Sequence, residues 1–308
     1  MQEFVAKPCT TDQYYLGECC RWDEVRGELY WVDVMSGRFF RATADASDVR
    51  ILRTYELSGE LCALAPLTER HGGWIVALGR SLAILDETGA IREVARPEGG
   101  NASVVRLNDG AADPWGRFVV GSMASGSQEG QASLYRYHES TGTRRLFGDV
   151  TISNGVGWSP DRRRMYYVDS GPGTIRTFDL DDNGGLSNRQ LFAQFDQGSD
   201  GTPDGLCVDV NGNLWVAFWG GYEVRQFSPA GEQLARVSLS TAQPSSCAIG
   251  GANGTTLYIT TAQEDMAPET LAAQRDAGRL FCVDVQVGGQ PIGTYRPTLL
   301  PATETPLH

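Results

Sequence analysis

The segment Asp209-Val-Asn-Gly-Asn-Leu-Trp-Val-Ala-Phe218 places a turn rich in Asp, Asn and Gly directly before a short apolar strand. Such residues favour tight chain reversal, so the segment predicts the first hairpin of a small sheet. A strand of the same type occurs six times, at 29–33, 74–78, 118–122, 165–169, 214–218 and 257–261. Successive copies begin 43 to 49 residues apart. A period of roughly 40–50 residues is typical of the four-stranded blades of a β-propeller.

A second pair of strands follows the first in each repeat, for example 134–137 and 145–147 around Thr141-Gly142. Six repeats of four strands nearly fill the 308 residues. We therefore predict an all-β fold, a single six-bladed β-propeller over residues 1–308 with four-stranded antiparallel blades around a central channel. A β-sandwich with irregular strands is the alternative, but it does not explain six near-equal periods.

Two segments fall outside this repeat pattern. Glu3-Phe4-Val5-Ala6 belongs to no blade, and we expect it to pair beside 278–284 and close the ring without free edges. The only helix that we expect spans 267–276, because Pro268 lies near its start and Gly278 follows its end. It would lie between strands of the sixth repeat.

The composition restricts the class of partner. The formal net charge of −12 repels nucleic acid and anionic lipid surfaces, and no Lys/Arg cluster interrupts it. The first seven residues lack the apolar core of a signal peptide, and no run of about 18 apolar residues offers a membrane span. Seven cysteines form an odd set without a C-x-x-C pair, which suits a reducing compartment. We expect a soluble cytoplasmic protein without a nucleic-acid, membrane or protein partner.

The innermost strand of each blade lines the channel of a propeller, so equivalent positions of the six repeats should converge there. Aligning the segments before the hairpins gives one column of residues, Glu18, Leu61, Asn108, Asn154, Asp204 and Ser246. Four of the six carry carboxylate or carboxamide oxygens, which Ca²⁺, Mg²⁺ and Mn²⁺ prefer. The column predicts a site for one hard divalent cation. The alternative is that Asn and Asp only supply turn hydrogen bonds where the strands begin.

Several other chemistries lack their motifs. The three histidines, His71, His138 and His308, lie outside the column, which disfavours a Ser-His-Asp mechanism and a closed zinc centre. No G-x-S-x-G elbow, Walker loop or dinucleotide fingerprint occurs.

At the column residues the chain resembles the SMP-30/gluconolactonase (regucalcin-like) family, and the likeness extends from about Tyr15 to Asp284. The matching segments are 16–23, 106–110, 116–123, 153–160, 203–206 and 212–219. The resemblance implies a metal held by Glu18, Asn154 and Asp204, three residues that also belong to the column. It further implies that Arg106 and Asn108 contact the substrate and that Asp204 is the catalytic base. The ion is left open among Ca, Mg, Mn, Zn and Fe.

Two positions depart from the family pattern. Cys20 stands where the family commonly has proline, which bears on how the first blade begins. Ala124-Ser-Gly-Ser127 follows Met123, where many members have a Glu that contacts substrate hydroxyls. The second departure bears on substrate preference.

The function that we predict is metal-dependent hydrolysis of sugar 1,4- or 1,5-lactones to aldonic acids. Either Asp204 deprotonates the attacking water or a hydroxide bound to the cation attacks, and Arg106 donates hydrogen bonds to sugar oxygens. Three aromatic residues, Tyr14, Trp219 and Tyr222, are expected either at the channel mouth or in the core. The alternatives are an arylesterase or organophosphate hydrolase, a non-catalytic calcium-binding or protein-interaction propeller, and a strictosidine-synthase-like propeller.

Overall fold

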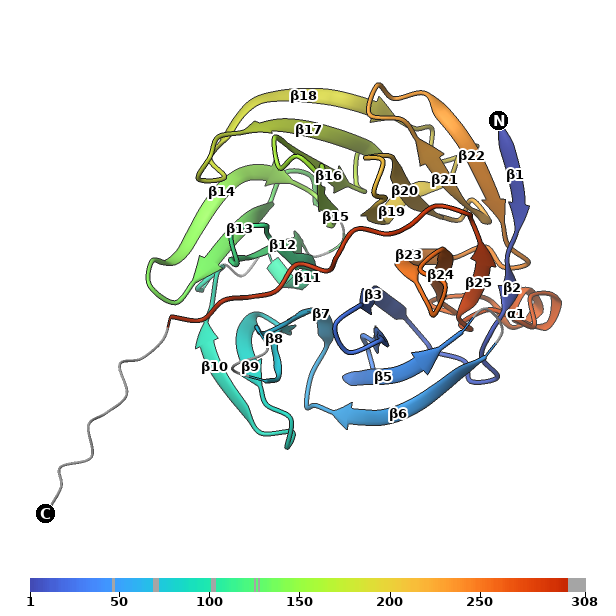
Figure 1. The fold of residues 1–308 in the computed structure, drawn as a ribbon, viewed down its shortest axis with the longest axis horizontal. Coiled ribbons are helices and arrows are strands. Elements are labelled where there is room, and N and C mark those ends of the chain that lie inside the picture. The colour runs from blue at the N-terminus through green and yellow to red at the C-terminus, as the bar shows by residue number, and fades with distance from the viewer. Residues whose placement is uncertain (46–47, 69–71, 101–103, 125, 127, 299–308) are drawn as a thin grey trace, which may run out of the picture.

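Six antiparallel sheets form a ring around a central channel in a computed structural model of the chain (Figure 1). The structure describes residues 1–45, 48–68, 72–100, 104–124, 126 and 128–298. Each sheet is one blade, and its strands follow one another in chain order from the channel to the rim, except that two strands from the N-terminus complete the rims of blades 5 and 6. The prediction of an all-β, six-bladed propeller is confirmed.

The strands of blades 1 and 2, innermost first, are β3 (Gly17–Asp23), β4 (Glu28–Asp33), β5 (Arg38–Ala44), β6 (Val49–Glu56), β7 (Leu61–Pro66), β8 (Trp74–Leu78), β9 (Ser81–Leu85) and β10 (Ile91–Ala95). Those of blades 3 and 4 are β11 (Val104–Ala112), β12 (Phe118–Ala124), β13 (Ala132–His138), β14 (Gly142–Val150), β15 (Ser153–Trp158), β16 (Arg164–Asp169), β17 (Thr174–Leu180) and β18 (Leu186–Gln194). Those of blades 5 and 6 are β19 (Thr202–Val208), β20 (Leu214–Trp219), β21 (Glu223–Phe227), β22 (Gln233–Ser238), β23 (Pro244–Gly250), β24 (Thr256–Thr261) and β25 (Phe281–Asp284).

The core lies between the blades. All six residues of β4 and all six of β24 are buried, because neighbouring blades pack against both faces of a blade. This double burial explains why the six repeated strands read as apolar runs instead of alternating patterns. The fourth strands lie at the rim, and β6 accordingly exposes most of its residues.

The N-terminal segment closes the ring differently from the prediction. Strand β1 (Gln2–Val5) adds a fifth strand to blade 5, parallel to β22, with Phe4 paired to Val237. The next strand, β2 (Lys7–Pro8), pairs antiparallel with β25 and supplies the fourth strand of blade 6. The expected pairing of 3–6 beside 278–284 is therefore wrong. The outer edges of blades 5 and 6 could each accept this segment, and the chain pairs with both. It passes from blade 5 to blade 6 near Ala6, whose N–H donates to Ser238 O at 3.0 Å.

The helix is also shorter than predicted. It is α1 (Pro268–Ala273), with Ala267 as its N-cap and Pro268 in its first turn. Gln274 ends it and turns its side chain toward the backbone N–H of Ala242, which donates to Gln274 Oε1 at 2.7 Å. Within the described ranges, no helix has both the length and the apolar character that crossing a bilayer requires.

Residues 285–298, which we call the C-terminal strap, cross one end of the channel (Figure 1). The backbone of the strap hydrogen-bonds to blades on both sides of the channel; for example, Tyr295 N–H donates to Pro66 O at 2.8 Å and Arg296 N–H to Gly116 O at 2.9 Å. The partners of the whole strap are Thr255 of blade 6, Val210 of blade 5, Trp158 of blade 4, Glu24 of blade 1, Pro66 of blade 2 and Gly116 of blade 3. The strap therefore contacts all six blades at the end where the inner strands finish.

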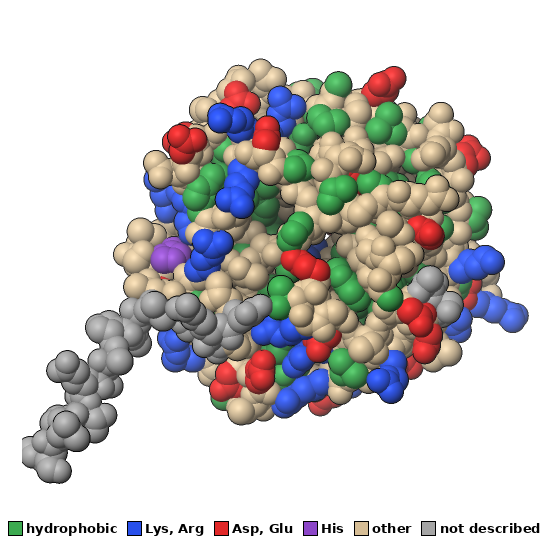
Figure 2. All heavy atoms as spheres, viewed as in Figure 1, with side chains coloured by type: hydrophobic (Ala, Val, Ile, Leu, Met, Phe, Trp, Pro, Cys, Tyr) green, Lys and Arg blue, Asp and Glu red, His purple; other side chains and the backbone are tan. Residues whose placement is uncertain are grey.

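A cavity of about 440 Å³ lies beneath the strap. Its walls combine apolar side chains such as Trp22 and Leu206 with charged ones such as Arg21 and Asp113, and strap residues 289–294 complete them. On the face that the strap crosses, acidic and basic side chains are interspersed around the rim (Figure 2). Apart from Asn108, which is the fifth of nine residues in β11, the column residues are among the first three of their inner strands and so lie toward the opposite end of the channel.

We predict that Tyr295 anchors the strap. Its ring is 1% exposed and stacks on Tyr137 with centroids 6.1 Å apart, and its hydroxyl accepts a hydrogen bond from Glu139 N–H at 3.0 Å. Tyr295→Ala should lower the free energy of unfolding by about 3–5 kcal/mol, as for other large buried aromatic residues. Tyr295→Phe keeps the ring and should lose only about 1 kcal/mol. Urea denaturation checks both, and equal losses would contradict the anchoring role of the ring.

Candidate functional site

The inner strands share one irregularity at the column residues. In every blade, the pairing between the first and second strands shifts register at or directly beside the column position. In blade 4 the shift falls between Ser153 and Val156, and in blade 5 between Pro203 and Leu206. A β-bulge bends its strand and redirects a side chain. The bulges explain how the side chains of Asn154 and Asp204 turn out of their sheets and toward the channel.

Glycines next to the column allow the inner strands to approach one another. A Cβ at Gly155 would lie 2.8 Å from Asp204 O, and a Cβ at Gly205 would lie 2.7 Å from Ser246 Oγ. Real Cβ atoms do not come this close to such atoms, so both positions require glycine. The short residues that follow the column thus serve the contact between neighbouring blades.

Three blades supply the predicted metal ligands. Glu18 is the second residue of β3, Asn154 the second of β15 and Asp204 the third of β19. Asn154 Nδ2 donates to Ser170 Oγ at 2.8 Å, and Ser170 Oγ donates to Pro203 O at 2.6 Å. This chain of hydrogen bonds fixes Asn154 relative to the strand that carries Asp204.

The pKa values of both carboxyl groups are raised, and Glu18 lies near enough to contribute to the shift of Asp204. Burial raises the pKa of Asp204 well above its ordinary value, and the negative charges of Glu18 and Asp109 raise it further. Burial also raises the pKa of Glu18 to about 8, again with a contribution from Asp109. Acidic groups that converge in this way need a compensating positive charge to remain ionised.

Unpaired oxygens surround the same region. Asp204 Oδ1, Asp109 Oδ2 and Ser246 Oγ are buried and have no hydrogen-bond partner among the described residues. Buried polar atoms are normally paired, so these oxygens fit a site that a cation or water completes. Within that part of the chain, no three His, Cys, Asp or Glu side chains group as they would around a metal. The predicted set has only two carboxylates, and its third member is the carboxamide of Asn154.

The predicted substrate residues lie beside the ligand set. Asn108 Nδ2 donates to Asn154 Oδ1 at 3.1 Å and to Ser153 O at 2.8 Å. Arg106 is 8% exposed, and its Nη1 donates to Asn108 Oδ1 and to Leu107 O. Arg106 is therefore a buried member of the site. Among the described residues, Arg106 donates hydrogen bonds through Nη1 alone. Its Nη2 and Nε could therefore donate to a ligand.

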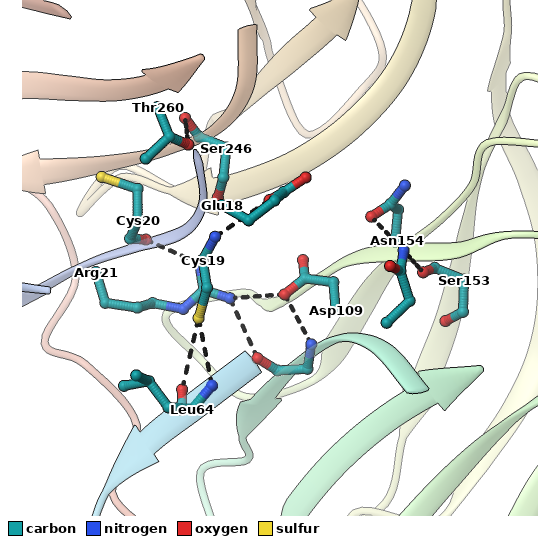
Figure 3. Close-up of polar contacts among 12 residues, drawn as sticks. Glu18, Cys19, Cys20, Arg21, Leu64, Asp109, Ser153, Asn154, Ser246 and Thr260 are labelled. Atoms are coloured by element: carbon teal, nitrogen blue, oxygen red, sulfur yellow. Dashed lines mark hydrogen bonds and ion pairs between the residues drawn. The ribbon is translucent and has the colours of Figure 1, made fainter. Parts of the chain in front are cut away.

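Two charged residues of the site escaped the sequence analysis. Arg21 Nη2 donates to Asp109 Oδ1 at 3.2 Å, an ion pair that joins blades 1 and 3. Figure 3 shows the Asp109 carboxyl between Glu18 and Asn154. Asp109 follows the column residue Asn108 directly, so its acidic side chain was the available signal. Nothing in the repeat pattern indicated that Arg21 reaches across two blades.

Glu264 was missed as well. It follows β24 in blade 6, and its negative charge raises the pKa of Asp204 while Arg106 lowers the pKa of Glu264. Burial is the larger influence on Glu264 and raises its pKa. The residue lies in a loop, outside the strand alignment that identified the column.

The first family departure has a structural outcome. Cys20 is fully buried and packs in a cluster with Trp31 and Tyr258, while Cys19 adopts a left-handed backbone with φ of 52°. The backbone N–H of Cys19 donates to Glu18 Oε2 at 3.1 Å. Blade 1 therefore begins at a bulge that retains Glu18. For the second departure, Ser125 and Ser127 lie outside the described residues.

The remaining expectations concern aromatic and histidine side chains. Tyr14 belongs to the core, where its ring lies 4.9 Å from that of Phe40. Tyr222 is 44% exposed and accepts a hydrogen bond from Gln274 near the end of α1. Trp219 is partly buried against a hydrophobic cluster. His138 contacts the strap through Arg296 O, at the end of the channel away from the column; His71 and His308 lie outside the described residues.

Known proteins resemble this chain along nearly its whole length. A 6-deoxy-6-sulfogluconolactonase of Pseudomonas putida is 35% identical over 274 residues, which cover 89% of this chain and 92% of that protein. An L-arabinolactonase of Azospirillum brasilense is 33% identical over 287 residues, covering 92% and 93%. A crystal structure of a calcium-binding protein, regucalcin, from Agrobacterium tumefaciens superposes with a TM-score of 0.86 at 25% identity, covering 96% and 98%.

The family model of the SMP-30/Gluconolactonase/LRE-like region matches residues 16–263. This stretch contains every column residue from Glu18 to Ser246, together with Arg106 and Asp109. The match covers most of the chain and includes the whole polar end of the channel. The chain therefore belongs to the SMP-30/gluconolactonase/LRE-like family.

Proposed function

We propose that this protein is a divalent-metal-dependent lactonase that opens sugar 1,4- or 1,5-lactones to aldonic acids. The observation that carries the proposal is the buried Asp204 carboxyl, whose Oδ1 has no partner among the described residues although Glu18 lies close enough to raise its pKa. The names of two relatives at 35% and 33% identity, which denote sugar lactonases, support the substrate class.

The residues present fit a hard cation. Glu18 and Asp204 offer carboxylate oxygens and Asn154 a carboxamide oxygen, which are preferred ligands of Ca²⁺, Mg²⁺ and Mn²⁺; Zn and Fe remain further candidates. A divalent ion in such a site polarises a carbonyl oxygen and stabilises the negative charge that develops there. The calcium-binding description of the regucalcin structure supports cation binding in this family.

Asp204 is the proton acceptor of the proposed reaction. Its unpaired Oδ1 accepts a proton from the water that attacks the carbonyl carbon of the lactone. The ring C–O bond then breaks, and Asp204 returns the proton to the departing alkoxide oxygen. The products are one hydroxyl and one carboxyl group on the same opened chain, so atoms and charge balance.

Arg106 and Asn108 orient the substrate in this scheme. Nη1 of Arg106 is occupied by Asn108 Oδ1 and Leu107 O, which holds the guanidinium plane in place. Nη2 and Nε then donate to ring hydroxyls or to the developing alkoxide. Because the strap crosses the opposite end of the channel, we place substrate access at the end where the inner strands begin.

The first test concerns the cation. Chelator-treated protein should lose lactone hydrolysis above the spontaneous rate, and one equivalent of a suitable divalent ion should restore it. Calorimetry should give one site per chain, and Glu18→Gln should weaken binding because it removes one of the two negative ligands. Full activity of metal-free protein would contradict metal dependence. Cation binding without any hydrolysis would favour the non-catalytic alternative.

The second test concerns the base. Asp204→Asn should lower kcat by about 10²-fold or more, because the amide can neither accept the proton nor contribute charge. Asp209→Asn is the matched control in the same blade, since Asp209 is fully buried but hydrogen-bonds to the turn at Asn211 and Asn213. The control should reduce stability and leave kcat per folded molecule unchanged. Near-wild-type turnover of Asp204→Asn at saturating metal would remove this residue from the mechanism.

The third test concerns substrate class. Sugar 1,4- or 1,5-lactones should be hydrolysed faster than aryl esters or phosphotriesters, and Arg106→Ala should reduce kcat/KM for a hydroxylated lactone more than for an unsubstituted lactone of equal ring size. An unpaired buried polar group costs about 1–3 kcal/mol, so the difference should be about tenfold or greater. Equal losses on both lactones would assign Arg106 to the reacting centre or to stability. Faster phosphotriester turnover would favour the organophosphate hydrolase alternative.

A further inference from the structure

The ion pair between Arg21 and Asp109 connects inner strands of blades that are not neighbours. Arg21 starts in β3 of blade 1 and Asp109 lies in β11 of blade 3, and the two side chains are 11% and 5% exposed. Arg21 also donates to Cys20 O at 2.9 Å and to Gly110 O at 3.2 Å. These contacts hold the guanidinium across the channel, as Figure 3 shows.

The same contacts orient the carboxyl group of Asp109. Oδ1 accepts from Arg21 Nη2 at 3.2 Å and from Gly110 N–H at 2.7 Å. Oδ2 is buried and receives no hydrogen bond from the described residues. In Figure 3 the oxygen without a dashed line lies on the side of the carboxyl that faces Glu18.

We infer that Asp109 is a positioning residue of the cation site, which raises the affinity for a divalent ion through its buried charge without belonging to the Glu18, Asn154 and Asp204 ligand set. The inference rests on the proposed metal-dependent function and adds a third acidic residue to the two of the ligand set.

The sign of the effect follows from the charges around the site. When ionised, the carboxylates of Glu18, Asp109 and Asp204 and the guanidinium groups of Arg21 and Arg106 sum to −1, and a divalent ion changes this sum to +1. Without the charge of Asp109, the loaded site would carry +2 in a poorly solvated channel. Loading is then less favourable, because charges in such surroundings interact more strongly than in water. Glu264 is partly exposed and is unchanged in every variant below, so it does not alter the comparison.

Asp109 also acts more directly on the ligands than Arg21 does. Among neighbouring charges, Asp109 has the largest effect on the pKa of Glu18. It has the second largest effect on the pKa of Asp204, after Glu18. Arg21 lowers the pKa of Glu18 by less than Asp109 raises it. Removing both members of the ion pair should therefore still weaken cation binding.

The test measures the dissociation constants of Ca²⁺ and Mn²⁺ by calorimetry, with full-length protein that has been freed of metal by a chelator. Asp109→Asn keeps the shape and an acceptor oxygen for Arg21, and it should raise Kd by about tenfold or more. Asp109→Glu restores the charge and should recover most of the affinity. A purely structural role of Asp109 would not produce this dependence on charge.

Asp113→Asn is the matched control. Asp113 follows the same inner strand at its other end, is 3% exposed, and forms an ion pair with Arg117 at 2.6 Å. Its replacement should reduce stability without changing Kd. If Asp109→Asn does not fold, Arg21→Met combined with Asp109→Asn removes the buried pair together, a change that proteins often tolerate.

The outcomes separate this inference from the proposed function. If the wild-type protein binds neither ion, the proposed metal site fails. If the wild type binds and folded Asp109→Asn, or the double variant, binds within about twofold of it, the inference is wrong while the metal site stands. A change in Kd for Asp113→Asn equal to that for Asp109→Asn would also overturn it, because the effect would then be general loss of rigidity.

Discussion

The close approach of neighbouring inner strands is the constraint on which the site depends. At Gly155 and Gly205 the next blade is so near that no side chain fits, and the bulges at these positions turn Asn154 and Asp204 toward the channel. Six blades that met less closely would leave a wider channel, and their polar side chains would stay separated by water. The glycines therefore determine how far acidic groups from different blades converge.

Convergence has an electrostatic cost that the surrounding residues only partly offset. Burial and the charge of Asp109 raise the pKa values of Glu18 and Asp204, and the charge of Glu18 raises that of Asp204 further. Arg21 and Arg106 supply positive charge, but each is already engaged with protein acceptors. The proposed cation would offset this repulsion, which links the fold to the proposed chemistry through one balance of charges.

The sequence predicted features that repeat and missed features that occur once. The six apolar strands and the column at Glu18, Asn154 and Asp204 were found because the same local pattern recurs at a regular period. The places of β1 and β2 were not predictable, since two sheet edges were free and a short segment fits either. Arg21 was missed for a related reason: its partner lies 88 residues away in a blade that is not adjacent, and no periodicity encodes such a contact.

The two ends of the channel differ because only one of them is covered by a segment outside the repeats. The strap lies so close to the inner strands that a Cβ at Gly293 would be 2.1 Å from Ala112 O and a Cβ at Gly289 would be 2.4 Å from Ile249 O. Beneath it the cavity walls combine apolar side chains with charged ones such as Arg21 and Asp113, whereas Glu18, Asn154 and Asp204 do not line this cavity. Because the strap covers this end and the column residues lie toward the other, we place the proposed polar chemistry of the channel at the end where the bulged strands begin.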